Sequence, residues 1–364
     1  MKKPVRVLVV DDSALMRKLI PKILEQADSI EVVGTAMDGE IGLRKIEELE
    51  PQVITLDLEM PGLNGIETLK QIMRRWHLPV VVVSSHSTAG ASVTLKALAL
   101  GAVDFVAKPQ DVWARMPEIA GELIAKILAA AQSQGVSVQF PTDAAPSDPS
   151  RKQNPAAPTR IVALGVSTGG PNALQYVFSQ LPAEFSGSIV AVQHMPDGFT
   201  ELFARRLDES CPMRVKEAQP GDLLLAGRVL ICPGNRHMKV KRLPLGNVAI
   251  LTEDEPVNGH RPSVDVLFRS VAEEFGPQSI GVLMTGMGED GAAGLGAIRA
   301  AGGMTIAQNQ ETCVVYGMPR AAIERGYAMR VVSLQDLPKT LQAQCAPDRT
   351  RDTEGRRSTS AGSN

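Results

Sequence analysis

Residues 160–171 read Arg160-Ile-Val-Ala-Leu-Gly-Val-Ser-Thr-Gly-Gly-Pro171. A short apolar strand runs there into a glycine-rich turn, and a segment typical of a helix follows. The pattern Gly165-Val-Ser-Thr-Gly169 matches the nucleophile elbow, in which a tight turn exposes a serine hydroxyl and leaves backbone N–H groups free for an oxyanion. Ser167 is therefore a candidate nucleophile, although a Ser-Thr-Gly-Gly turn by itself is often only a helix cap.

Candidate partners for this serine follow two other apolar strands of the same half. Among the five histidines, only His194 directly follows a strand of the kind that carries Ser167, and Asp290 comes after a third strand. Parallel strands bring their carboxyl ends to one crevice, so Ser167, His194 and Asp290 form a candidate catalytic triad. Glu289 is an alternative acid, and His260 is the strongest competing base.

Other chemistries fit this half less well. An ordinary α/β-hydrolase has the order Ser, Asp, His, which would give Ser167, Asp222 and His260. A dinucleotide-binding turn needs an acidic residue at the end of the second strand, where Gln193 and His194 stand instead. A non-catalytic binding module, in which Ser167 is only a cap, is the alternative from a different class.

Length and charge set the broad class of the protein. The 364 residues are enough for two domains, and a formal net charge of −2 without a dense Lys/Arg cluster argues against nucleic-acid binding as the main activity. The first apolar run is too short for a signal peptide, and we expect no membrane insertion. The four cysteines are scattered without disulfide or metal-ligand spacing, so we expect a cytoplasmic location.

The alternation of strand-like and helix-like segments predicts an α/β fold of two doubly wound parallel-sheet domains. A flavodoxin-like domain over 1–128 is followed by a flexible Pro/Ala-rich linker over 129–158. A Rossmann-like Ser-hydrolase domain over 159–346 contains an antiparallel hairpin region over 215–252, and a disordered tail covers 347–364. The expected strands are Val5–Val10, Glu31–Ala36, Val53–Leu56, Val80–Val83, Phe105–Ala107, Ile161–Val166, Ile189–Gln193 and Ile280–Thr285.

Acidic side chains meet at the carboxyl edge of the first expected sheet. Asp11 and Asp12 follow its first strand, Asp57 the third, Ser84 the fourth and Lys108 the fifth. Crowded carboxylates repel one another unless a hard cation neutralises them, and Mg²⁺ suits carboxylate oxygens. The pattern predicts a Mg²⁺ site where the carboxylate at 57 attacks a phosphoryl group, while the lysine and the hydroxyl stabilise charge on its oxygens.

The first 128 residues resemble the receiver domain of two-component response regulators. The motifs that carry the resemblance are Val10-Asp-Asp-Ser13, Asp57-Leu-Glu-Met-Pro-Gly-Leu-Asn-Gly65 and Asp104-Phe-Val-Ala-Lys-Pro109. The resemblance implies that Asp57 accepts phosphate from a chemotaxis sensor histidine kinase. It also implies that Asp11 and Asp12 bind Mg²⁺ with help from the Glu59 backbone.

The same resemblance implies a switch. Ser84 and Phe105 would report the phosphorylation, and the bond between Lys108 and Pro109 would be cis. Because the receiver precedes the catalytic half, we expect it to cover the catalytic crevice until Asp57 is phosphorylated, and phosphorylation to shift closed molecules toward open ones.

The second half resembles the catalytic domain of chemotaxis protein-glutamate methylesterases. The motifs are Gly165-Val-Ser-Thr-Gly-Gly-Pro171, Gln193-His-Met-Pro196, Arg261-Pro-Ser-Val-Asp265 and Thr285-Gly-Met-Gly-Glu-Asp-Gly-Ala292. The resemblance implies that Ser167 attacks a glutamyl methyl ester on the cytoplasmic domain of a methylated chemoreceptor, and that methanol leaves before water releases the glutamate. His194 would be the general acid and base and Asp290 the orienting acid. Specific receptor glutamines would be deamidated by the same route, and this chemistry needs no cofactor.

Groups around the serine complete the expected site. Backbone N–H groups of Thr168 and Met287 are the candidate oxyanion donors. Arg261 lies in a polar turn, where it would hold either a substrate carboxylate or a neighbouring loop.

Overall fold

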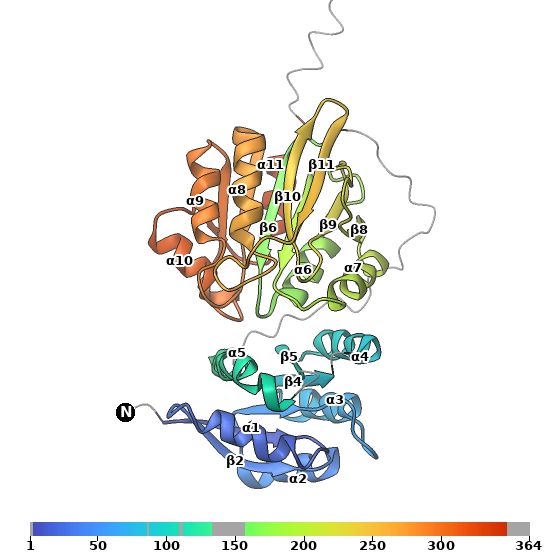
Figure 1. Ribbon diagram of the computed structural model, residues 1–364, viewed down its shortest axis with the longest axis vertical. Coiled ribbons are helices and arrows are strands. Elements are labelled where there is room, and N and C mark those ends of the chain that lie inside the picture. Colours follow the sequence, from blue (N-terminus) through green and yellow to red (C-terminus); the bar gives the residue numbers. More distant parts are fainter. Residues whose placement is uncertain (1–2, 86, 109–111, 133–156, 348–364) are drawn as a thin grey trace, which may run out of the picture.

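The computed structural model describes residues 3–85, 87–108, 112–132 and 157–347, without the side chains at 88 and 112–118. Two α/β domains stack end to end in it, with the N-terminal domain below the second domain in Figure 1. The expected fold of two doubly wound parallel-sheet domains is therefore confirmed. Most of the expected linker and nearly all of the expected tail lie outside the described residues.

The N-terminal domain is a five-stranded parallel sheet in the order β2-β1-β3-β4-β5, as in flavodoxin-like folds. Its strands are β1 (Val5–Val10), β2 (Ile30–Ala36), β3 (Val53–Leu56), β4 (Val80–Ser85) and β5 (Asp104–Lys108). Its helices are α1 (Met16–Leu24), α2 (Gly39–Leu49), α3 (Gly65–Arg75), α4 (Thr88–Ala99) and α5 (Val112–Gln132). Ser84 lies inside β4 rather than after it, and α5 runs past residue 128 to Gln132.

Sequence explains where these elements lie. Strand β3 is buried along its whole length, as expected for a parallel sheet with helices on both faces. Three helices begin at capping side chains: Asp38 accepts a hydrogen bond from the N–H of Ile41, and Asn64 and Ser87 play the same part at α3 and α4. Such caps satisfy N–H groups that the first helical turn leaves unpaired.

The second domain holds a seven-stranded parallel sheet in the order β14-β13-β12-β6-β7-β9-β8. Its strands are β6 (Ile161–Val166), β7 (Ser188–Gln193), β8 (Arg214–Glu217), β9 (Arg228–Ile231), β12 (Ser279–Leu283), β13 (Met304–Gln308) and β14 (Arg330–Val332). The chain reaches β7 on one side of β6 and β12 on the other. The crevice at the carboxyl ends of β6 and β12 is therefore a topological switch point, where open α/β sheets bind ligands.

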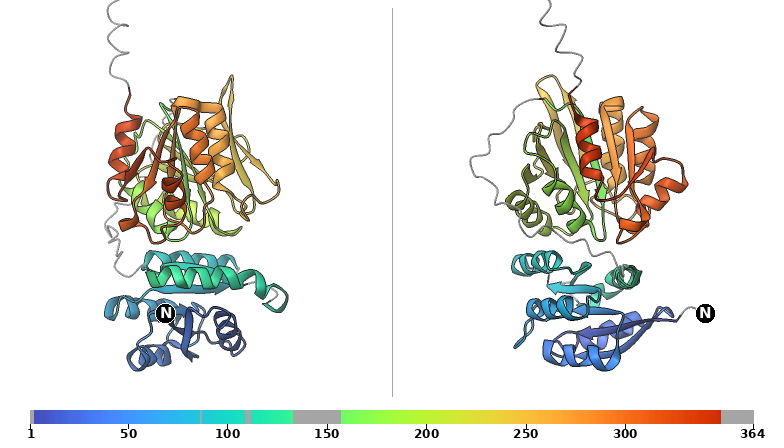
Figure 2. Two further views of the ribbon diagram at one scale, coloured as in Figure 1. Left: turned by 90° about the vertical axis from the view of Figure 1, so that its left-hand side faces the viewer. Right: turned by 180° about the vertical axis from the view of Figure 1, so that it is seen from behind.

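Helices cover both faces of this sheet (Figures 1 and 2). They are α6 (Gly170–Ser179), α7 (Phe199–Ser210), α8 (Val264–Phe275), α9 (Ala292–Ala300), α10 (Met318–Glu324) and α11 (Leu337–Cys345), with 3₁₀ turns at Gly276–Gln278 and Gln310–Thr312. Alternate residues of β6 belong to different cores: Val162 and Leu164 lie in the core with α6, α7 and α11, whereas Ile161 and Ala163 lie in the core with α8, α9 and α10.

The expected antiparallel region over 215–252 needs a correction. Strands β10 (His237–Leu243) and β11 (Gly246–Thr252) do form an antiparallel hairpin, but β8 and β9 run parallel within the main sheet. The glycine turn before β9 resembles a hairpin turn, yet Leu223 in that loop bridges to Val248 of β11 instead. The loop between β8 and β9 therefore packs on the hairpin, and it leads back to the start of the sheet, where β9 begins parallel to β8. Strands β13 and β14 are absent from the sequence prediction.

The N-terminal domain contacts the second domain through α4 and β5. Helix α4 packs on α7 and α6, and the ring of Phe105 in β5 stacks on Phe199 of α7 with centroids 4.8 Å apart. Asp104 lies beside Thr168, the residue after Ser167. One buried apolar cluster contains residues of both domains. The receiver therefore lies against the edge of the second domain that carries the candidate nucleophile.

Two findings bear on the chemical character of the chain. All four cysteines are buried, and burial raises the pKa of the Cys313 and Cys345 thiols to about 12. Over the described ranges, the helices include none that is long and apolar enough to cross a bilayer.

Candidate active site

Ser167 stands at the carboxyl end of β6, at the switch point. Its N–H donates to the carbonyl of Thr285 (3.0 Å) and its carbonyl accepts from the N–H of Gly170 (2.8 Å), which ties the turn to the loop after β12. Gly169 has φ of +75°, and a Cβ there would lie 2.6 Å from Val314. Backbone conformation and close approach both require glycine at this position.

His194 follows β7, the neighbour of β6. Its N–H donates to the carbonyl of Val166 at 3.1 Å, so the histidine is attached to the strand that carries the serine. The side-chain amide of Gln193 donates to the carbonyls of Ser167 (3.1 Å) and His194 (3.0 Å). One amide thereby links the backbones of both candidate catalytic residues, a role that sequence reasoning missed.

Asp290 lies in the loop after β12 and is almost completely buried. Its Oδ2 accepts from His194 Nε2 (2.9 Å) and the N–H of Val264 (2.7 Å), and its Oδ1 accepts from Ser263 Oγ (2.8 Å) and Asn258 Nδ2 (2.9 Å). Burial alone would raise the pKa of Asp290. The interaction with His194 and the donors of Asn258 and Val264 outweigh burial and hold that pKa far below its usual range.

The two nitrogens of His194 have different surroundings. Nε2 contacts Asp290, whereas Nδ1 is buried and has no hydrogen-bond partner among the described residues. Nδ1 is therefore the nitrogen left to receive a proton from Ser167. No hydrogen bond joins the two side chains in the described part of the chain, and such bonds often form only when substrate is present.

The alternative acids are engaged elsewhere. Asp222 accepts from Lys216 Nζ at 2.9 Å and from the N–H of Gln219 at 2.7 Å. Glu289 is exposed and pairs with Arg325. Across the described ranges neither carboxylate contacts a histidine, so the geometry favours Asp290.

His260 lies directly against His194. The two rings are stacked with centroids 4.0 Å apart and an interplanar angle of 12°. Burial and the neighbouring His194 lower the pKa of His260 to about 4, although Asp290 acts in the opposite direction. His260 is therefore uncharged at neutral pH. From the sequence, His260 is a competing base in a polar turn that is expected to contact substrate or to be structural, and its contact with His194 is not predicted.

The candidate oxyanion donors lie next to the serine in sequence and in the loop after β12. The carbonyl of Thr168 accepts from Thr285 Oγ1 at 2.9 Å, and the side chain of Met287 is 42 % exposed beside the switch point. The backbone N–H groups of Thr168 and Met287 make no hydrogen bonds to the described residues. Both are thus available to a ligand, as an oxyanion donor must be.

Arg261 holds a neighbouring loop. Its guanidinium donates to Asn235 Oδ1 (2.8 and 3.1 Å) and to the carbonyls of Glu253 and Asp254 (3.0 and 3.2 Å). Of its two expected roles, the structure supports the loop contact. This contact fixes the segment that carries Asn258 and His260.

The acidic residues of the receiver come together as expected. Asp11, Asp12 and Asp57 offer carboxylate oxygens within 4.8 Å of one another, and Lys108 Nζ lies 2.6 Å from Asp57 Oδ2 and 3.0 Å from Asp11 Oδ2. Burial raises the pKa of Asp11, and the carboxylate of Asp57 adds to the rise while Lys108 opposes it. The ammonium of Lys108 is the positive partner of the buried Oδ2 of Asp11. This arrangement suits a hard cation.

The expected switch residues lie close to that site. Ser84 is buried and accepts from Thr94 Oγ1 at 2.6 Å. The N–H of Glu59 donates to Asp57 Oδ1 at 3.1 Å. Phe105 is buried and occupies the domain interface described above. The expected cis bond before Pro109 lies outside the described residues.

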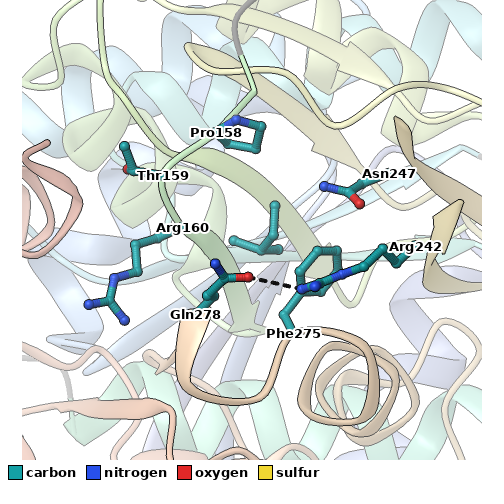
Figure 3. A pocket seen from close by; sticks show the side chains of 8 residues that line it. Pro158, Thr159, Arg160, Arg242, Asn247, Phe275 and Gln278 are labelled. Atoms are coloured by element: carbon teal, nitrogen blue, oxygen red, sulfur yellow. Dashed lines mark hydrogen bonds between the residues drawn. The ribbon is translucent and has the colours of Figure 1, made fainter. Parts of the chain in front are cut away.

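A cavity of about 200 Å³ lies far from this chemistry. Arg160 and Ile161, at the start of β6, line it together with Arg242 of the hairpin (Figure 3). The amino end of β6 is the edge opposite Ser167. Arg242 also donates to Gln278 at 2.9 Å. This cavity is therefore separate from the candidate active site.

Comparisons with known proteins identify both domains. The family described as CheB methylesterase matches residues 162–341, and the response regulator receiver domain matches residues 7–115. Protein-glutamate methylesterase/protein-glutamine glutaminase 2 of Koribacter versatilis is 57 % identical over 354 residues, covering 95 % of this chain and 98 % of that protein. The corresponding protein of Symbiobacterium thermophilum is 47 % identical, covering 92 % of this chain and 95 % of its own.

One solved structure is similar to the second domain. The CheB methylesterase catalytic domain of Thermotoga maritima has 41 % sequence identity and a TM-score of 0.50, and the match covers 50 % of this chain and 97 % of that one.

Fold and sites together define a response regulator whose receiver is joined to an α/β catalytic domain. Within that class, the identity along nearly the whole chain is specific. The chain belongs to the protein-glutamate methylesterase/protein-glutamine glutaminase family.

Proposed function

We propose that this chain is a phosphorylation-activated serine hydrolase that removes methyl esters from chemoreceptor glutamates and deamidates specific receptor glutamines. The substrate class comes from the family. The observation that carries the mechanism is the buried contact between His194 and Asp290 at the switch point where Ser167 ends its strand. The sites of such a substrate lie on receptor cytoplasmic domains, so the proposed place of action is the cytoplasm.

In the first half-reaction Ser167 Oγ attacks the ester carbonyl carbon, and its proton passes to Nδ1 of His194. Backbone N–H groups of Thr168 and Met287 bind the oxyanion. The carbon–methoxy bond then breaks, and His194 gives the proton to the leaving methoxide, so methanol departs. For a glutamine substrate ammonia leaves instead.

Water completes the cycle. It attacks the acyl-enzyme while His194 takes its proton, and that proton returns to Ser167 Oγ as the glutamate is released. Asp290 stays ionised because of its hydrogen-bond donors, so it stabilises the imidazolium that forms in both halves. The proposed steps use no cofactor.

The receiver would control access to this site. Asp11, Asp12 and Asp57 would hold Mg²⁺, which neutralises phosphoryl charge when bound. Asp57 would accept the phosphoryl group from a chemotaxis sensor histidine kinase, and the ammonium of Lys108 would pair with the new oxygens instead of the carboxylate.

Strand β5 is the physical link between the two sites. Lys108 at its end contacts Asp57, Phe105 stacks on Phe199, and Asp104 lies beside Thr168. A shift of β5 on phosphorylation would loosen contacts next to the nucleophile. The receiver would thus restrain the catalytic domain until Asp57 is modified.

The test is methanol release from methylated receptor membranes, with and without Mg²⁺ and a small phosphodonor. We expect Ser167→Ala to lower the rate by about 10³-fold or more, because removing a nucleophile leaves only residual catalysis. Ser179→Ala at the end of α6 is the matched control, because that hydroxyl donates to the carbonyl of Tyr176 and accepts from the adjacent Gln180 side chain. A rate unchanged by Ser167→Ala would favour a phospho-switched binding module instead.

A further inference from the structure

We propose that His260 is a positioning residue for this reaction, an uncharged stacking platform that holds the ring of His194 in the orientation needed for proton transfer. The inference rests on the proposed role of His194 as the general base. It assigns to His260 no contact with the reacting atoms.

One hydrogen bond is not enough to orient an imidazole. Asp290 fixes the Nε2 edge of His194, but the ring can still turn about that bond, and the second side-chain torsion of histidine is broad. The face of His260 lies 4.0 Å away at 12° to the ring of His194. A flat neighbour at that distance blocks rotation and keeps Nδ1 in the plane from which Ser167 can be reached.

The platform is itself held by the network around the acid. His260 and Val257 exchange backbone hydrogen bonds of 3.0 and 3.1 Å, which close a tight loop. Asn258 in that loop has φ of +55° and donates its side-chain N–H to Asp290. Arg261 anchors the other end of the loop. The same short segment thus fixes both the acid and the face of the base.

The electrostatics favour a neutral platform. The ionisable groups around His260 are His194, Asp290 and, from helix α5 of the receiver, Glu122. Because burial and His194 lower the pKa of His260 to about 4, the ring stays neutral while His194 gains and loses a proton. A neutral aromatic face attracts a stacked cation, whereas a second cation would repel it.

The experiment follows methanol release by the full chain without phosphodonor, so that the pH dependence of phosphorylation does not enter. The rate is recorded from about pH 5.5 to 8, where histidine titrates. The variants are His260→Ala, His260→Phe and His260→Arg. His77→Asn is the control, because His77 is an exposed histidine of the receiver with φ of +54°, which asparagine tolerates.

We expect His260→Ala to lower kcat by about 10- to 100-fold with little change in KM, the size of loss that follows misplacement of a catalytic group. His260→Phe keeps a flat face against His194. We therefore expect it to retain most of the kcat that His260→Ala loses, with the acid limb of the pH profile at the same pH. His260→Arg places a fixed cation on His194, so the acid limb moves to lower pH.

Stability against pH is the second measurement. A histidine with a lowered pKa binds a proton more readily in the unfolded chain, so the free energy of unfolding falls as pH drops from 6.5 towards about 4. We expect His260→Phe to make that fall shallower. An identical fall in both proteins would show that His260 does not stay neutral in the fold, which contradicts the platform.

Two rate results would also overturn the inference: an unchanged rate for His260→Ala, or a folded His260→Phe as inactive as His260→Ala. If the proposed role of His194 as the base is wrong, the activities of two further variants differ from those above. If His194→Gln keeps its activity while His260→Gln loses it, His260 is the base and the assignment of His194 is wrong.

Discussion

Two asparagines in the loops around the active site share a backbone conformation and have opposite electrostatic surroundings. Asn258 and Asn235 have φ of +55° and +58°, a region that asparagine and aspartate tolerate. Asn258 donates to two carboxylates, those of Asp290 and Asp265 at 2.9 and 3.0 Å, whereas the oxygen of Asn235 accepts from Arg261. The same substitution at these positions should therefore have opposite effects.

We expect Asn258→Asp to lower methanol release at least tenfold and to destabilise the fold by about 1–3 kcal/mol, because a donor is lost and a third carboxylate enters a buried acidic cluster. Asn235→Asp should change both quantities little, because Arg261 faces the new charge. Activity assays and urea unfolding of the two variants measure this contrast. Equal losses of activity and stability in both variants would mean that the charge of the neighbouring side chains does not decide the effect of either substitution.

Some residues of the candidate active site could be predicted from the sequence and others could not. Ser167, His194 and Asp290 were predicted to lie together because each follows an apolar strand and parallel strands bring their ends together, and the structure places His194 in contact with Asp290. The polar turn from Asn258 to Ser263 was expected to contact substrate or to be structural, but its hydrogen bonds to Asp290 were not predicted, because loop geometry leaves no periodic signal in a sequence. The stack of two histidines far apart in sequence is equally invisible there.

Among the elements, β5 connects the acidic site with the interface between the two domains. It carries Lys108 for the acidic site and Phe105 for the contact with α7. An aromatic pair is worth about 0.5–1.5 kcal/mol beyond the area it buries, which corresponds to roughly a 2- to 10-fold change in an equilibrium. This single contact can therefore account for part of the closed state and not for all of it.

We expect Phe105→Leu to raise the rate of methanol release without phosphodonor by about 2- to 10-fold, since the lost ring pair weakens the closed arrangement. Phe178→Leu, which truncates a fully buried ring of the second domain, is the control for general loosening. A basal rate that rises equally in both variants, or in neither, would show that the contact with Phe199 does not restrain the enzyme.

Helices and strands were predicted best where all residues of the element are buried. Central strands such as β3 and β6 are buried along their whole length and were placed correctly. The direction of β8 and β9 was wrong, because short turns signal a chain reversal without showing which strand the chain then joins. Edge strand β14 is partly exposed and spans only three residues, so its sequence gives little signal.

At the scale of the whole molecule, the question is how the acidic site of the receiver would control the candidate active site. Moving a protein from almost all closed to almost all open takes about 5.5 kcal/mol of differential binding, more than one contact supplies. Under the proposed mechanism, phosphorylation would therefore act on the β5 strand, the acidic cluster and the α4 surface together.

We expect Asp57→Asn to abolish the rise in methanol release that Mg²⁺ and phosphodonor cause, because the amide cannot accept the phosphoryl group. Asp38→Asn, which keeps a good cap for α2, should retain the rise. The ratio of rates with and without phosphodonor measures both. A ratio in Asp57→Asn as high as in the unmodified chain would exclude Asp57 as the acceptor.

The burial of all four cysteines has a practical consequence for watching this coupling. Thiolates are the species that react with maleimides, and a buried thiol of raised pKa forms little thiolate. We therefore expect the native cysteines to react little with such dyes. Two dyes attached at introduced surface cysteines, one on each domain, would report the separation of receiver and catalytic domain in single molecules without removal of any native residue.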